Sequence, residues 1–132
     1  MKMDIMVISP TTQSILANGI VPLDLIARRK GRCVQSNNNS ITLLSPGYYL
    51  VNASMTITAP AAGIATLVVQ KNGVAVPGLT ASETITTADT EERTLNVSGL
   101  IKVYCNENAN ITLNNTGVAV TSSNVSFSIS EV

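Results

Sequence analysis

The chain has 132 residues, of which only 12% are charged, and its eight basic and eight acidic side chains give a net charge of zero. This length fits one domain, and the balanced charge does not fit a nucleic-acid binder that neutralises phosphates. The sequence contains no histidine, which excludes serine–histidine catalysis and every zinc site that needs a histidine ligand.

Other features narrow the class further. Two cysteines are too few for a four-thiolate metal site, and no apolar run approaches the 18 residues of a membrane-spanning helix. We therefore expect a protein without enzymatic activity, cofactor or metal, and without a nucleic-acid or membrane partner. A carboxylate-based glycosidase that uses Glu91 and Glu92 is the least favoured alternative.

The first segment, residues 1–12, is short and carries an apolar stretch. We expect it to be an arm that becomes ordered on a partner, followed by a single domain over residues 13–132. The candidate docking residues of this arm are Ile5, Val7 and Ile8.

Short strands are expected at 15–16, 23–27, 33–35 and 41–44. A cluster of basic residues interrupts this series, and it consists of Arg28, Arg29, Lys30 and Arg32. One interpretation is a solvated loop, and the other is a contact with an acidic partner. Nucleic acid is the weakest choice of partner, because no aromatic residues are interleaved for base stacking.

The first long strand is expected over residues 48–57, between the turn at Pro46-Gly47 and Pro60. A strand over 64–71 then ends at Asn72-Gly73, a dipeptide that is typical of a tight hairpin. Further strands are expected at 74–79, 80–87, 95–103, 111–113 and 122–132. In the last of these, Val125, Phe127 and Ile129 alternate with serines, which places them on one face.

This pattern amounts to about eight to ten strands at intervals of roughly 8 to 12 residues, and no segment has the pattern of a helix. Parallel sheets need crossover connections that are usually helical. The sequence therefore predicts an all-β protein, an antiparallel β-sandwich of the jelly-roll type.

Four apolar side chains lie on the outward positions of two predicted long strands: Tyr48, Leu50, Leu100 and Tyr104. If both strands belong to one sheet, these residues form an exposed patch with aromatic members, and such patches tend to be interfaces. The alternative is that they are isolated surface residues. We favour an interface between copies of the chain.

Cys33 and Cys105 are 72 positions apart. A disulfide between them would close a long loop and stabilise the fold by a few kcal/mol, roughly 2–4. Two free thiols are the alternative, because the sequence does not place their Cα atoms.

Three segments together resemble the tumour-necrosis-factor and complement-globular-head superfamily, most of all its small bacterial and bacteriophage members. The first is residues 41–54, where an apolar strand is followed by Pro46-Gly47 and an aromatic-rich strand. The second is residues 68–78, which contain Lys71-Asn72-Gly73 and Pro77-Gly78. The third is the alternating strand 124–129. The resemblance implies a homotrimeric jelly roll, in which Tyr48, Leu50, Leu100 and Tyr104 would line the three-fold axis.

The resemblance also implies a function. Phage members look like capsid decoration proteins or the heads of head fibres, and related heads sit on collagen-like stalks of spore coats. This chain has no Gly-x-y repeat, which favours a compact knob. We expect a structural virion protein on the outer surface of a phage head, bound to the major capsid protein or other head proteins, where it stabilises the shell or mediates adhesion.

The alternative from another class is an adhesin head on a phage, bacterial cell or spore surface. Its partner would be a cell-surface glycan or a receptor, because loops rich in Asn and Ser and exposed tyrosines can bind sugars.

Overall fold

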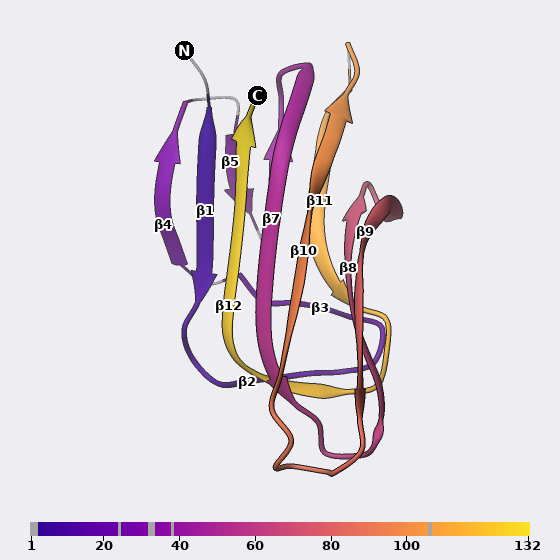
Figure 1. The fold of residues 1–132 in the computed structure, drawn as a ribbon. Coiled ribbons are helices and arrows are strands. Elements are labelled where there is room, and N and C mark those ends of the chain that lie inside the picture. The colour runs from indigo at the N-terminus through magenta and orange to yellow at the C-terminus, as the bar shows by residue number, and fades with distance from the viewer. Residues whose placement is uncertain (1–2, 24, 32–33, 38, 106) are drawn as a thin grey trace.

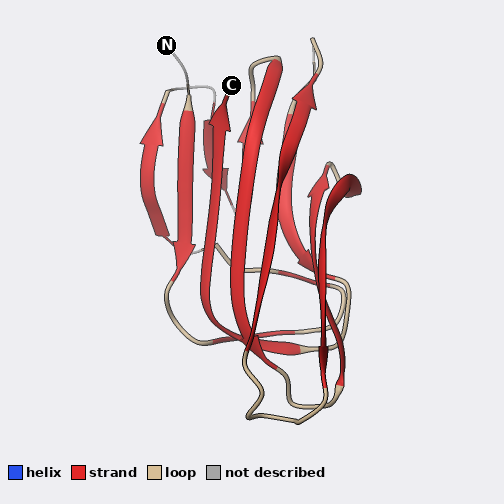
Figure 2. Cartoon of the chain, in the orientation of Figure 1, coloured by secondary structure: helices blue, strands red, loops and turns tan. Residues whose placement is uncertain are grey.

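The computed structural model describes residues 3–23, 25–31, 34–37, 39–105 and 107–132, with 34–37 described by their backbone alone. Within these residues the chain forms twelve strands joined by loops and turns (Figure 2). This part of the chain contains no helix long and apolar enough to cross a membrane.

The strands form two antiparallel sheets that pack face to face (Figure 1). Sheet A has the order β10-β7-β12-β1-β4, with β2 also on β12. Its strands are β1 (Asp4–Ser9), β2 (Gln13–Ile15), β4 (Leu25–Lys30), β7 (Gly47–Thr58), β10 (Arg93–Val103) and β12 (Val120–Glu131).

Sheet B has the order β5-β6-β11-β8-β9, with β3 also on β11. Its strands are β3 (Gly19–Ile20), β5 (Val34–Asn37), β6 (Ser40–Leu43), β8 (Gly63–Lys71), β9 (Val74–Ile85) and β11 (Ala109–Asn115). Most neighbours in both sheets are distant in the sequence, as the connections of a jelly roll require. The predicted all-β sandwich of the jelly-roll type is thereby confirmed.

The core lies between the sheets and follows the alternation of the strands. The buried residues of β7 are every second one: Tyr49, Val51, Ala53, Met55 and Ile57. The strand β12 buries Val125, Phe127 and Ile129 in the same way. Successive side chains of a strand point to opposite faces, so the period-two patterns of the sequence are the pattern of the core.

The hairpin at Asn72-Gly73 is confirmed. Both residues have positive φ, 52° and 83°, and they connect β8 to β9. The strand β9 continues through Pro77-Gly78 as one element, where the sequence suggested two. Proline is tolerated there because β9 is an edge strand, whose outer side needs no ladder donor.

Residues 4–9, expected to belong to an arm, form β1 in the interior of sheet A, between β12 and β4. Ile5 and Val7 are fully buried, and Ile8 is half-buried. The expectation of a partner-dependent arm is therefore wrong for these residues. Pairing with β12 and β4 and the burial of Ile5 and Val7 supply the contacts that work against the entropy cost of ordering the segment.

Candidate interaction surface

Four exposed apolar side chains lie together at one end of sheet A. Because β7 and β10 are neighbours, Leu50 lies opposite Leu100, and Tyr48 lies opposite Lys102. Tyr104 follows directly after β10. The exposed fractions are 52% for Tyr48, 39% for Leu50, 55% for Leu100 and 56% for Tyr104. We call these four residues the tyrosine–leucine patch, and about half of each side chain is free to contact a partner.

One ammonium group lies between the two rings of the tyrosine–leucine patch. Lys102 Nζ is 5.5 Å from the ring centroid of Tyr48 and 4.8 Å from that of Tyr104. Cation–π contacts at exposed sites contribute about 0.5–1 kcal/mol. Among the described residues, Lys102 forms no ion pair with a carboxylate. The lysine therefore helps to order the two rings without a charge partner of its own.

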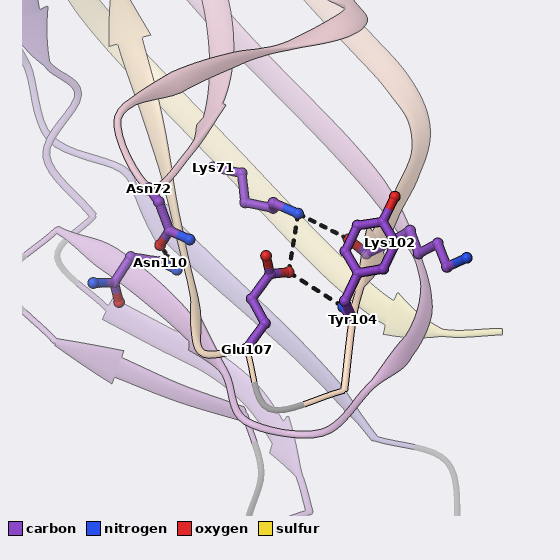
Figure 3. Close-up of polar contacts among 6 residues, drawn as sticks. All are labelled: Lys71, Asn72, Lys102, Tyr104, Glu107 and Asn110. Atoms are coloured by element: carbon purple, nitrogen blue, oxygen red, sulfur yellow. Dashed lines mark hydrogen bonds and ion pairs between the residues drawn. The ribbon is translucent and has the colours of Figure 1, made fainter.

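A polar network beside the patch ties the β8–β9 turn to the connection between β10 and β11 (Figure 3). Lys71 Nζ donates to Glu107 Oε1 at 3.0 Å and to the Lys102 carbonyl oxygen at 3.1 Å. The same Glu107 oxygen accepts a hydrogen bond from the backbone N–H of Tyr104 at 3.2 Å. The hydrogen bond from Lys71, followed by that from Tyr104, lowers the pKa of Glu107 below its ordinary value. The network positions the loop that carries Tyr104.

A second set of bonds holds the same turn from the other side. The backbone N–H of Asn110 donates to Asn72 Oδ1 at 2.9 Å, and the N–H of Asn72 donates to the Asn110 carbonyl oxygen at 2.8 Å. The sequence predicted the turn but not this network. Lys71 and Glu107 are 36 residues apart, and no motif connects them.

The patch continues around the edge of the sandwich into a groove of about 280 Å³ between the first residues of β9 and the last of β10. Val74, Val76 and Leu100 line it with apolar side chains, and Lys71, Lys102 and Tyr104 also contribute to its walls. Leu100 and Tyr104 belong to both groove and patch, so the two form one continuous surface.

The remainder of the outer face of these strands is polar but uncharged. Asn52 lies opposite Ser98, and Ser54 lies opposite Asn96. Ser98 Oγ donates to Asn52 Oδ1 at 2.7 Å. These residues line a shallow hollow of about 190 Å³ with two serines of β12. Covering an ionised group is costly, so this face is easier to bury against another protein than a charged face would be.

The apolar docking residues predicted in the N-terminal segment do not form a docking site. Ile5 and Val7 face the core with no exposed area, so their assignment as docking residues is wrong. Of the apolar side chains of β1, only Met6 and, in part, Ile8 reach the outer face of sheet A. The stretch is apolar at consecutive positions, which hid the alternation that separates its two faces.

The basic residues are exposed, but on a strand and not in a loop. Arg28, Arg29 and Lys30 lie on β4, the edge strand of sheet A. Arg28 Nε forms an ion pair with Asp4 Oδ1 at 2.9 Å, and the hydrogen bond and charge of Asp4 raise the pKa of Arg28. Arg32 lies outside the described residues.

Cys105 is exposed and forms no disulfide with any residue that the structure describes. Cys33 lies outside the described residues, so its pairing with Cys105 stays a prediction.

Glu91, in the acidic loop of residues 89–92, is held by neighbours in its own stretch of the chain. Glu91 accepts hydrogen bonds from the backbone and hydroxyl of Thr86, at 3.1 and 2.7 Å, and lies 3.3 Å from Arg93. The bonds from Thr86 are the main cause that lowers the pKa of Glu91. In the part of the chain that the structure describes, no three metal-ligating side chains come together. Glu91 thus serves to close its own loop.

No family model matches this sequence, and neither does any curated protein. Several solved structures are similar. Murine APRIL at pH 8.5 aligns over all of both chains with a TM-score of 0.78 and 11% identity. An Eiger TNF from S. frugiperda aligns over 100% of this chain and 92% of its own, with a TM-score of 0.74 and 7% identity. The globular domain of a zebrafish complement 1qA protein aligns over 96% of this chain and 94% of its own, with a TM-score of 0.69 and 9% identity.

These similarities define the class of the domain. It is an all-β, two-sheet jelly roll of the TNF and C1q type, which confirms the fold that the sequence resemblance implied. At these identities the shared feature is the path of the chain and not its side chains. The function must therefore be argued from the surface described above.

Proposed function

We propose that this chain is a homotrimeric, non-catalytic head protein of a bacteriophage virion, docked on the outside of the capsid shell. The observation that carries the trimer is the tyrosine–leucine patch, which is exposed and continuous with an uncharged sheet face. Large apolar patches on small domains mark interaction sites.

The sheet face that adjoins the tyrosine–leucine patch and Lys102 carries no charged side chain of its own. No Asp, Glu, Lys or Arg occurs in residues 50–56 of β7, 94–101 of β10 or 124–130 of β12. The net charge of the chain is also zero, so copies do not repel one another over long distances. The resemblance of the sequence to trimeric jelly rolls supports three copies around one axis.

The virion part of the proposal is supported by the resemblance of residues 41–54 and 68–78 to small phage proteins. In this role the trimer binds the major capsid protein or other head proteins. The exposed residues Arg28, Arg29 and Lys30 lie on the opposite edge of sheet A from β10. They therefore belong to a surface separate from the tyrosine–leucine patch.

The second candidate is a receptor- or glycan-binding head at a cell or spore surface. Its support is the pair of exposed rings of Tyr48 and Tyr104 with an ammonium between them. Tyrosine combines an apolar ring with a hydroxyl group, which suits surface recognition. Micromolar binding on a glycan array that is lost in a Tyr48→Ala and Tyr104→Ala double variant would favour this candidate.

Solution mass and shell binding test the main proposal separately. Light scattering behind a sizing column should give about 41 kDa, three times the 13.8 kDa of the chain. Shells of the encoding phage, purified without this protein, should carry it into the pellet on sedimentation. A mass of one chain at all concentrations would refute the trimer, and a protein that stays in the supernatant would refute the docking.

A further inference from the structure

We propose that β4 is a docking strand, whose open edge accepts an extended acidic segment of a partner chain as an additional strand of sheet A. The inference deepens the docking part of the proposed function. β4 and the tyrosine–leucine patch lie at opposite edges of sheet A and share no residue.

The backbone of β4 is available on one side. Residues 25–26 and 28–30 pair with β1, with a bulge at Ala27 between the two runs, and no other strand of the described chain lies beyond them in the sheet. The outer edge of such a strand presents unpaired N–H and C=O groups, which can form a ladder with another chain. Strand addition of this kind takes its affinity from main-chain hydrogen bonds and its specificity from alternate side chains.

The apolar side chains of β4 are also uncovered. All six residues of the strand are exposed, including Leu25 at 52% and Ile26 at 50%. Ile26 lies opposite Val7, which is fully buried. The core therefore ends between these two strands, and an added strand would extend the cover over Ile26.

The charge of β4 determines the chemistry of the partner. Arg28 is paired with Asp4, but Arg29 has no carboxylate partner among the described residues. Lys30 lies across from the same Asp4 that Arg28 already holds. Because successive residues of a strand point to opposite faces, positive charge lies on both faces of the edge. A partner strand with carboxylates on both faces would complement it.

The same charges argue against other occupants. Two copies of β4 paired edge to edge would bring their cations together, and like charges on paired strands are destabilising. A nucleic acid would neutralise the cations but would leave the backbone edge unpaired. An extended acidic polypeptide would pair with the backbone edge, neutralise the cations and cover Ile26.

Fluorescence anisotropy with a labelled ten-residue peptide of alternating Glu and Val, with blocked ends, tests this inference on the full chain. We expect saturable binding that weakens as salt is raised, because exposed ion pairs are screened. A double variant, Arg29→Ser with Lys30→Ser, should bind about tenfold more weakly, since it removes two exposed charge contacts. The matched control is Arg93→Ser, which removes an exposed arginine from β10 at the far edge of the sheet.

Two further probes separate strand addition from simple charge attraction. A peptide with the same number of glutamates but proline at every valine position cannot form the ladder, and we expect it not to bind. A single-stranded oligonucleotide of similar charge should bind more weakly than the Glu–Val peptide. Equal binding of the proline peptide, tighter binding of the oligonucleotide, or an unchanged affinity in the double variant would each overturn the inference.

These outcomes are distinct from a failure of the proposed function. The trimer is tested by solution mass and the docking by co-sedimentation with shells. The peptide titration measures only the affinity of β4 for an acidic strand. Peptide binding without shell binding would assign β4 to a different acidic partner, and shell binding without peptide binding would remove β4 as the docking strand.

Discussion

Replacing Leu100 with serine is the sharpest test of the tyrosine–leucine patch. Leu100 is 55% exposed in the single chain. Full burial of a leucine side chain contributes about 1.5–3 kcal/mol, so covering its exposed half contributes about 1–1.5 kcal/mol per copy. Three copies would lose roughly 3–4.5 kcal/mol. We expect the overall dissociation constant of the trimer to rise about 10²- to 10³-fold.

The assay is sedimentation velocity over a dilution series, in which the variant should dissociate at concentrations where the natural chain is still a trimer. Ile64→Ser is the matched control, because Ile64 is also 55% exposed but lies on β8 of sheet B. Substitutions at exposed positions usually change stability by less than about 0.5 kcal/mol, so both variants should keep the circular dichroism of the folded chain. Equal dissociation of the two variants, or none in either, would refute the patch as the interface.

Three further predictions concern the fold and its polar network. Phe127→Ala, at a fully buried position, should lower the free energy of unfolding in urea by about 3–5 kcal/mol, whereas Ser128→Ala on the outer face should change it little. In Gly117→Ala the new methyl group would meet the backbone of β8, so we expect a loss of about 1–3 kcal/mol by thermal unfolding; an unchanged melting temperature would show that the loop shifts freely. The lowered pKa of Glu107 means that its contribution to stability is present above the unfolded pKa, about 4.3, and is lost as the pH falls through the folded pKa. Glu107→Gln should therefore be less stable than the natural chain at pH 7 but not at pH 3, and a difference that is equal at both pH values would contradict the ion-pair account.

The four residues of the tyrosine–leucine patch could be predicted from the sequence, because they are apolar at outward positions of their strands. Tyr48 and Leu50 interrupt the polar side of one alternating strand, and Leu100 and Tyr104 interrupt that of another. Each pair could be recognised as out of place on its own. That the two pairs meet depends on β7 and β10 being neighbours with Leu50 opposite Leu100, and this pairing is a property of the sheet order.

Other parts of the surface had no local signal. Glu107 lies in a short polar connection and looks like any solvated loop residue until the β8–β9 turn brings Lys71 beside it. The basic residues of β4 look like a loop in the sequence, because three consecutive cations obscure any alternation. Their position at an open sheet edge follows only from pairing with β1.

The sequence by itself determined the class of the fold. Two of its signals are local: the period-two alternation around Tyr49 and Phe127, and the Asn72-Gly73 turn. They can be recognised in the sequence because side-chain direction in a strand and turn geometry depend on neighbouring residues. The tertiary structure decided which strands are partners, and this changed the meaning of residues 4–9 from an arm to an interior strand. A short apolar stretch is compatible with either state, since only the contacts supplied by distant strands compensate the entropy of ordering it.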